Sequence, residues 1–132
     1  MSKKYKEIAE LEAQIFGQNA YSENLVRETL DGKNTICLTH EIEGRVVAYL
    51  LATKTPPECT IDRVGTAPSH RRNGLAHKLM EQLMANDYSF FLDVRATNIP
   101  AIELYKSFGF EQISVRKGYY KNPTEDGIIM QK

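Results

Sequence analysis

Apolar residues near the N-terminus recur at helical spacing and predict that the chain opens with two helices. The first apolar stripe consists of Ile8, Leu11 and Ile15, with lysines and glutamates expected on the opposite face. This pattern is typical of an amphipathic helix, which we expect to end at Gly17. Ser22 is a suitable N-cap for a second helix over residues 23–30, and Asp31-Gly32 is expected to stop it.

The rest of the chain alternates between strand-like and helix-like patterns. Runs rich in apolar and β-branched residues predict strands at 35–41, 45–53, 59–66, 88–94, 110–119 and 127–131. Helical spacing predicts a helix from Leu75 to about Asn86, and another between Asn98 and Gly109. The order ααβββαβαββ, without a linker or a repeat, predicts one α/β domain over residues 1–132.

The composition is that of a soluble globular protein. Hydrophobic residues make up 42% and charged residues 26% of the chain. Basic and acidic residues number 17 each, so the charge balance indicates neither a nucleic acid nor a membrane surface as a partner. Cys37 and Cys59 lie in apolar stretches without metal-ligand spacing around them. We interpret them as buried free thiols of a cytoplasmic protein, and we expect no metal site.

One segment combines basic residues with a glycine where a helix begins. It consists of Arg71, Arg72, Asn73, Gly74, Leu75 and Ala76. The first turn of a helix has unpaired N–H donors, and small residues such as Gly74 and Ala76 let phosphate oxygens approach the backbone closely. Arg71 and Arg72 would add positive charge. Taken alone, this pattern is more typical of a solvated helix start than of a binding site.

The surrounding residues change that interpretation. Residues 71–76, in the pattern Arg-x-x-Gly-x-Ala, follow a strand that ends in Val-Gly-Thr at 64–66, and they resemble the phosphate-binding turn of the GNAT N-acetyltransferase superfamily. Three further blocks are similar to the RimI-type ribosomal-protein-alanine N-acetyltransferases: 61–68, 91–98 and 101–110. The resemblance covers about residues 7–131. It implies the GNAT fold, a central mixed and mostly antiparallel twisted sheet flanked by about four helices.

The resemblance also implies acetyl-CoA as the acetyl donor. Its pantetheine arm would pair like an extra strand with the backbone of Val64, Gly65 and Thr66, and residues 71–76 would hold its pyrophosphate. Asn98 would cap its helix and also contact the pantetheine amides. Neither cysteine has a neighbour in the sequence that would lower the pKa of its thiol, so we expect direct transfer in a ternary complex rather than an acetyl-cysteine.

Two residues are candidates for proton transfer. Tyr105 is the candidate general acid, because a phenol with a pKa of about 10 stays protonated and can donate to a thiolate. The alternative for Tyr105 is a place in the core. Asp93 is the candidate base, at a position where the RimI pattern has Glu. Because Asp is shorter by one methylene, we expect Asp93 to act through water.

Other roles for the acidic residues stay open. Asp93 is alternatively expected to form a salt bridge with Arg63 or Arg95. Asp62, on the neighbouring strand, is a rival for the role of base, and strand alternation would place it on one face with Thr60 and Val64.

The acceptor is expected to lie against the first two helices, with Tyr21, Tyr119 and Tyr120 flanking an extended peptide. The resemblance implies a protein N-terminus as acceptor, the alanine of a small-subunit ribosomal protein, and we expect a monomer or weak homodimer. Two alternatives stay open. One is acetylation of a small-molecule amine such as a polyamine, and the other is a catalytically silent acyl-CoA-binding module.

The N-terminus departs from the family pattern. Members usually begin with a strand, whereas this chain reaches its first helix almost at once. We therefore expect the first edge strand to be missing or shortened, or the start to be truncated. Without that strand, residues 35–41 would form an exposed edge of the sheet.

Overall fold

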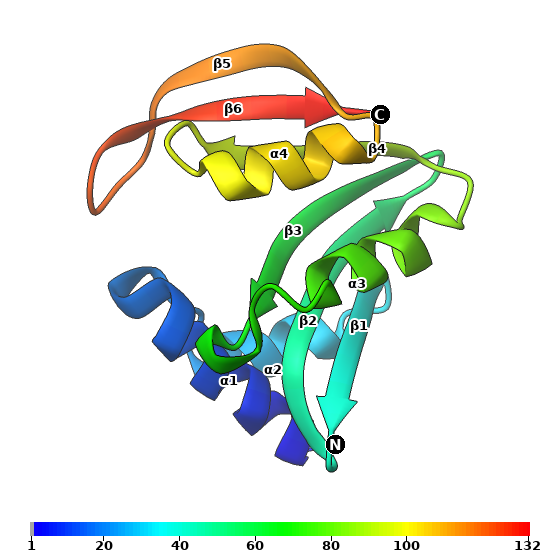
Figure 1. The fold of residues 1–132 in the computed structure, drawn as a ribbon, viewed down its shortest axis with the longest axis vertical. Helices are drawn as coiled ribbons and strands as arrows, with labels where there is room; N and C mark the ends of the chain where they lie inside the picture. Colours follow the sequence, from blue (N-terminus) through cyan, green and yellow to red (C-terminus); the bar gives the residue numbers. More distant parts are fainter. Residues whose placement is uncertain (1) are drawn as a thin grey trace.

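A computed structural model describes residues 2–132 and confirms the predicted order of elements (Figure 1). The helices are α1 (Ser2–Phe16), α2 (Glu23–Asp31), α3 (Leu75–Met84) and α4 (Ile99–Ser107). The strands are β1 (Thr35–Ile42), β2 (Arg45–Thr55), β3 (Glu58–Thr66), β4 (Ser89–Arg95), β5 (Glu111–Tyr120) and β6 (Glu125–Gln131). Short 3-10 helices, η1 (Gly17–Asn19) and η2 (Pro68–His70), follow α1 and β3.

All six strands belong to one sheet in the order β1-β2-β3-β4-β6-β5. Every neighbouring pair is antiparallel except β3 and β4, which are parallel. The expected mixed, mostly antiparallel sheet is therefore confirmed. β1 is an edge strand, as expected for residues 35–41.

Helices cover both faces of the sheet around β2. Its residues from Val46 to Ala52 are all buried, which requires cover on both sides. Figure 1 shows α3 and α4 on the near side of the sheet, with α2 behind it. On the far face, the Tyr49 hydroxyl of β2 donates a hydrogen bond to Glu12 of α1. The sheet thus has an α1 face and an α3 face.

A bulge interrupts β3 at its centre. Ile61 lies opposite Ala52 and Arg63 lies opposite Leu51, which leaves Asp62 without a partner on β2. Such an extra residue bends a strand and reverses the faces of the side chains that follow it. Arg63 is therefore turned to the α1 face.

The pairing of β3 with β4 ends beside this bulge. The last paired residues are Ile61 and Leu92, and beyond them the two strands diverge (Figure 1). We call the space between them the opening.

The bulge also makes one prediction wrong, because Val64 follows it and no longer shares a face with Thr60.

The predicted polar face of α1 is also partly wrong. Ile8 and Leu11 are buried as expected, but Glu7 and Glu12 are only 5% and 0% exposed. Glu7 accepts a hydrogen bond from the backbone N–H of Val46, 2.7 Å away, and Glu12 has partners that are described below. A carboxylate can be buried in this way because its oxygens are hydrogen-bonded.

Gly65 allows Tyr49 to lie flat against β3. A Cβ atom on Gly65 would come within 2.7 Å of the Tyr49 ring, on the paired position of β2. We expect Gly65→Ala to lower the free energy of unfolding by about 1–3 kcal/mol, the usual effect of overpacking. Thr66→Ala, at the next position, adds no atom and is the control. Equal midpoints of chemical denaturation for both variants would contradict this account.

Candidate active site

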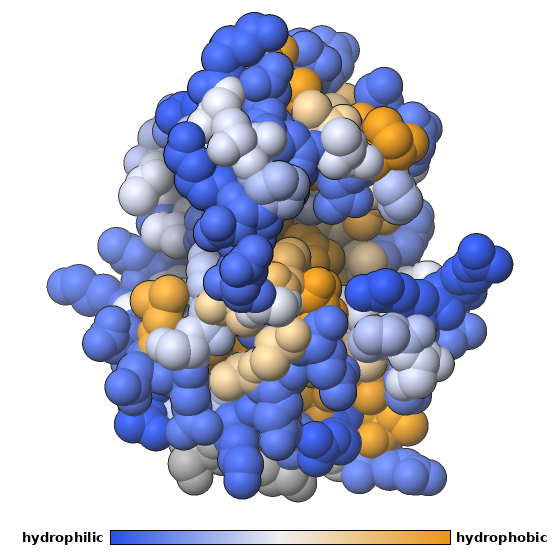
Figure 2. All heavy atoms as spheres, turned by 90° about the vertical axis from the view of Figure 1, so that its left-hand side faces the viewer, coloured by the Kyte–Doolittle hydropathy of each residue, from blue (hydrophilic) through white to orange (hydrophobic). Residues whose placement is uncertain are grey.

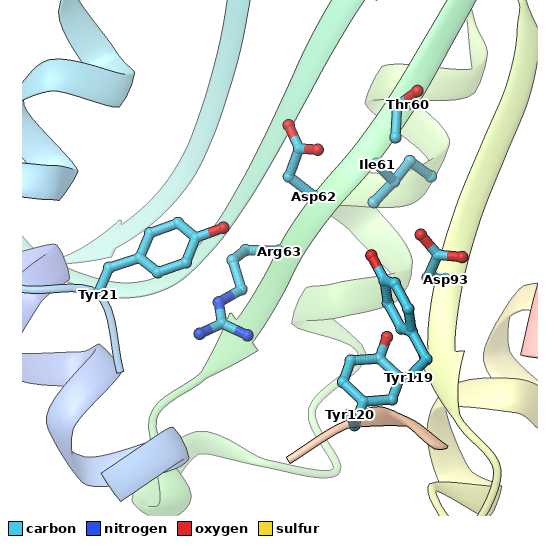
Figure 3. Close-up of a pocket in the computed structure, with 8 residues that line it drawn as sticks. All are labelled: Tyr21, Thr60, Ile61, Asp62, Arg63, Asp93, Tyr119 and Tyr120. Atoms are coloured by element: carbon cyan, nitrogen blue, oxygen red, sulfur yellow. The ribbon is translucent and has the colours of Figure 1, made fainter. Parts of the chain in front are cut away.

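A cavity of about 240 Å³ occupies the α1 side of the opening. Its walls are formed by Tyr21, Thr60, Ile61, Asp62, Arg63, Asp93, Tyr119 and Tyr120 (Figure 3). The structure thus brings together the three tyrosines predicted for the acceptor, the predicted base and its rival carboxylate. Viewed from the side on which the strands diverge, the surface is hollowed there, and apolar side chains show among hydrophilic surroundings (Figure 2).

Arg63 forms one wall of the cavity. Its guanidinium lies between the rings of Phe16 and Tyr21, 3.9 Å and 4.4 Å from their centroids. Its Nη2 atom donates to the backbone oxygen of Asn19 at 2.6 Å and lies 3.2 Å from Oε1 of Glu12. Cation–π contacts and an ion pair therefore hold this side chain from three directions.

Glu12 stands behind that wall and was not predicted from the sequence. Besides the ion pair with Arg63, it accepts hydrogen bonds from the Tyr49 hydroxyl and from the backbone N–H of Tyr21, the latter at 2.9 Å. Glu12 follows Ile8 by four residues and therefore lies on the apolar stripe of α1. This position is the sign in the sequence that its carboxylate is buried. A charged residue on a buried stripe needs partners, but spacing alone does not name them.

Arg95 and Glu125 hold the opposite wall. Arg95 donates to the backbone oxygens of Lys121 and Pro123, at 2.7 Å and 3.0 Å, and pairs with Glu125 at 3.1 Å. Its guanidinium also lies 4.6 Å from the ring centroid of Tyr120. These contacts fix the β5–β6 turn that carries the cavity tyrosines.

Asn19 connects the two walls. Its Nδ2 atom donates to the backbone oxygen of Asn122 at 3.1 Å, while its own backbone oxygen accepts from Arg63. The loop after α1 and the β5–β6 turn therefore meet beside the cavity.

Asp93 does not form either of the expected salt bridges, because Arg63 and Arg95 are engaged elsewhere. Its nearest cation is Arg116, with Nε 3.9 Å from Oδ1. The side chain is 30% exposed, yet Oδ1 is buried and has no hydrogen-bond partner within residues 2–132. The rival Asp62 accepts a hydrogen bond from the Thr53 hydroxyl at 2.7 Å. Asp93 thus has a buried carboxylate oxygen without a hydrogen bond, whereas one oxygen of Asp62 is bonded to Thr53.

Tyr105 lies apart from the cavity-lining residues. It is 8% exposed, comes from α4 on the α3 side of the sheet, and makes an edge-on contact with the ring of Phe110. Burial, and then the neighbouring Tyr120, raise the pKa of Tyr105 to about 12. Burial, and then the charge of Asp93, likewise raise the pKa of Tyr120 to about 12. Both phenols are therefore protonated at neutral pH.

The basic-glycine segment forms an open turn before α3. Gly74 is the N-cap residue with φ 72°, and Arg72 also has a positive φ, of 67°. The Arg71 side chain donates to the backbone oxygen of Thr66 at 3.3 Å, and Asn73 donates to that of His70 at 3.2 Å. The first N–H groups of α3, including those of Leu75 and Ala76, point out of the helix and are suited to an anion.

The backbone of β3 has a free edge at the opening. The N–H of Ala67 donates to Val47 of β2, so by antiparallel alternation the N–H groups of Val64 and Thr66 point away from β2. No residue of β4 pairs with them. This edge lies between the turn before α3 and the cavity, and it can accept an extended chain.

The remaining predicted residues have local roles. Asn98 caps α4 as expected, accepting a hydrogen bond from the N–H of Ala101 at 3.3 Å.

The thiols of Cys37 and Cys59 are both free. Cys37 is only partly buried, and burial raises the pKa of both thiols. Within residues 2–132, no cluster of His, Cys, Asp or Glu could hold a metal ion.

The family model described as the acetyltransferase (GNAT) family matches residues 5–110. The chain belongs to this family. In the crystal structure of the ribosomal-protein-S18-alanine N-acetyltransferase from Escherichia coli, the GNAT fold matches this one with a TM-score of 0.89 and 25% sequence identity, over 99% of this chain and 88% of that one. The expected fold and the resemblance stated above are confirmed.

Two curated GNAT relatives show how far the similarity extends. The ribosomal protein bS18-alanine N-acetyltransferase of Escherichia coli strain K12 is 34% identical over 89 residues, 64% of this chain and 59% of that protein. The N-alpha-acetyltransferase RimI of Mycobacterium tuberculosis is 28% identical over 131 residues, 94% of this chain and 83% of that protein. The match to the first thus spans less than two thirds of that relative's length.

No helix in the part of the chain from residue 2 onward is both long and apolar enough to cross a bilayer.

The contacts of Glu125 predict a pH-dependent stability. Hydrogen bonds from the side chain and the backbone N–H of Thr97, followed by Arg95, hold the pKa of Glu125 below its ordinary value of 4.5. A lowered folded-state pKa stabilises the fold above pH 4.5, and this contribution is lost as the pH falls through the folded-state pKa. We expect Glu125→Gln to be less stable than wild type at pH 7, and the difference to shrink below pH 4.5.

Urea denaturation at a series of pH values measures this difference. Glu103→Gln changes an exposed carboxylate on α4 and is the control. A difference between wild type and Glu125→Gln that stays constant from pH 7 to pH 3 would contradict the role given to Glu125.

Proposed function

We propose that this protein is an acetyl-CoA-dependent N-acetyltransferase of protein N-termini, which acetylates the α-amine of an N-terminal alanine on a small-subunit ribosomal protein. Transfer is direct, within a ternary complex. The observation that carries the proposal is the free edge of β3 at residues 64–66, between an anion-binding turn and a cavity that contains a carboxylate. A ribosomal acceptor also implies that the enzyme works in the cytoplasm.

The α3 side of the opening suits acetyl-CoA, which supplies the acetyl thioester. Its pyrophosphate binds the N–H groups of residues 74–76, and Arg71 and Arg72 balance its charge. The amides of its pantetheine arm pair with the N–H groups of Val64 and Thr66 and with the C=O group of Val64, which β4 leaves unpaired. Gly74 leaves this approach clear, because nothing lies within 4 Å of the position of a Cβ atom there.

The cavity suits an ammonium group. Asp62 and Asp93 line it with negative charge, whereas the charge of Arg63 is balanced by the buried Glu12. Asp93 takes the proton of the bound ammonium, through water because its side chain is short, and leaves a neutral amine. The rings of Tyr21, Tyr119 and Tyr120 then flank the peptide that follows the amine.

Bond formation and cleavage follow from these positions. The amine nitrogen attacks the thioester carbon, the carbon–sulfur bond breaks, and the sulfur leaves as a thiolate, while the nitrogen releases its second proton to water. Tyr105 donates its hydroxyl proton to that thiolate. With a pKa of about 12, Tyr105 remains protonated until the thiolate forms. In this proposal Asp93 acts from the α1 face of the sheet, where it lines the cavity, and Tyr105 acts from α4 on the α3 face.

The relatives support the choice of acceptor. The name of the Mycobacterium tuberculosis protein describes N-alpha-acetylation, and that of the Escherichia coli protein specifies N-acetylation of alanine on bS18. A second candidate follows from the cavity itself. Two carboxylates in a small cavity also favour a small polycation, such as a polyamine.

Acetyl transfer to defined acceptors tests the proposal. The protein is incubated with acetyl-CoA and a peptide that begins with alanine, the same peptide with a blocked N-terminus, or spermidine. Release of free CoA thiol and the product masses are followed. We expect acetylation of the free peptide alone. Turnover of spermidine alone would favour the small-amine enzyme, and tight acetyl-CoA binding without any turnover would leave a silent acyl-CoA-binding module.

Tyr105→Phe tests the proton donor. It removes the hydroxyl and keeps the buried ring, so we expect kcat to fall about 100-fold or more, the usual contribution of general acid catalysis. Tyr88→Phe makes the same change at a partly buried ring that contacts Phe90 and lies outside the cavity. Equal kcat values for the two variants would exclude Tyr105 as the acid.

Gly74→Asp tests the phosphate site. A carboxylate at the start of α3 would repel the pyrophosphate, and we expect acetyl-CoA affinity to fall more than about 10-fold. Gly44→Asp is a matched control, because Gly44 also has a positive φ and an equally open Cβ position, in the β1–β2 turn. Calorimetric titration measures both affinities. If the two variants bind acetyl-CoA equally well, the phosphate does not lie on this turn.

A further inference from the structure

The carboxylate of Glu12 is the most completely buried charge among the described residues, and the proposed chemistry makes no direct use of it. Its side chain is 0% exposed. It nevertheless accepts one hydrogen bond from the Tyr21 backbone N–H and another from the Tyr49 hydroxyl, and it forms an ion pair with Arg63. These partners come from the loop before α2, from β2 and from β3. One carboxylate thus joins three segments that are distant in the sequence.

Each partner contributes to the opening. Tyr21 and Arg63 form the cavity wall that faces Tyr119 and Tyr120. The ring of Tyr49 packs against Gly65, a residue of the free edge of β3. Burial and the charge of Glu12 raise the pKa of Tyr49, so its hydroxyl keeps the proton that it donates to Glu12. The same carboxylate therefore holds Tyr21 and Arg63 of the acceptor wall and reaches, through Tyr49, the edge of β3, whose backbone is itself fixed by pairing with β2.

Stability is a weak explanation for this arrangement. Desolvation of two charges offsets much of their attraction, and apolar residues often replace a buried ion pair without loss of stability. α1 already offers an apolar stripe at this position, so a leucine at residue 12 would extend the core. A carboxylate here is better explained by the geometry that it imposes.

We propose that Glu12 is a positioning residue, which sets Tyr21 and Arg63 of the acceptor wall in register with the edge of β3 that binds the donor. The proposal rests on the proposed function, since it assigns acceptor and donor to the two sides of the opening. A residue of α1 that does not react itself would then determine how the acceptor amine is aligned with the acetyl donor.

Glu12→Gln tests the proposal, because it keeps the shape of the side chain and removes its charge. Glu10→Gln is the matched control, with the same change on the same helix at an exposed residue that pairs with Arg45. We expect kcat/KM for the alanine peptide to fall about 100-fold in Glu12→Gln, as small misalignments do. The Kd for acetyl-CoA should stay within about twofold of wild type, as for Glu10→Gln.

A double variant separates positioning from folding. Glu12→Gln leaves the Arg63 guanidinium without its counter-charge, so adding Arg63→Gln should cost little further activity if the two act as a unit. Activities are expressed per folded molecule, at a temperature well below the unfolding midpoints. If Glu12→Gln lowers only the midpoint and retains the kcat and KM of Glu10→Gln, or if the two changes multiply, the positioning role is excluded.

A second readout does not depend on any acceptor. In NMR spectra, Glu12→Gln should make the backbone amide of Tyr21 exchange faster and should shift the Arg63 Nε–H signal, whereas Glu10→Gln should change neither. If wild type acetylates no peptide while these changes occur, the proposed function fails and the positioning of the wall stands. If the signals of Tyr21 and Arg63 are unchanged, Glu12 does not position them, whatever the activity.

Discussion

The early end of hydrogen bonding between β3 and β4 is the constraint on which the rest of the structure depends. Parallel strands would normally continue their pairing, but the unpaired Asp62 bends β3 away after Ile61. One consequence is that the outward N–H groups of Val64 and Thr66 have no partner on β4. The other is a cavity between the strands, open on the α1 face. The free edge and the cavity thus follow from a single extra residue in one strand.

An ion pair fixes each wall of the cavity, and the hydrogen bond from Asn19 to Asn122 joins the two walls. Glu12 and Arg63 fix the wall next to α1, while Arg95 and Glu125 fix the β5–β6 turn. Each pair is internally neutral, so the carboxylates that line the cavity outside these pairs are those of Asp62 and Asp93, the latter 3.9 Å from Arg116. The scaffold therefore leaves an electrostatic field suited to a cationic amine.

Local features of this protein could be predicted from its sequence, and long-range ones could not. The elements and the turn at residues 71–76 were found because periodicity, glycine and proline act over a few neighbouring residues. A β-bulge produces no periodic pattern in the sequence, so the prediction that Val64 shares a face with Thr60 was wrong. Glu12 has partners up to 51 positions away in the printed sequence, at Arg63, and only packing reveals them. Tyr21, Asp93, Tyr119 and Tyr120 were named by family resemblance, and the structure shows that they share a cavity.

The central claim is that the free edge of β3 binds the acetyl donor, and amide hydrogen exchange tests it most directly. Exchange is compared with and without saturating acetyl-CoA, with occupancy established by calorimetry. The account predicts slower exchange at Val64 and Thr66, together with the first amides of α3, because the pantetheine arm and the pyrophosphate take up these donors. Full occupancy with unchanged exchange at Val64 and Thr66 would contradict it.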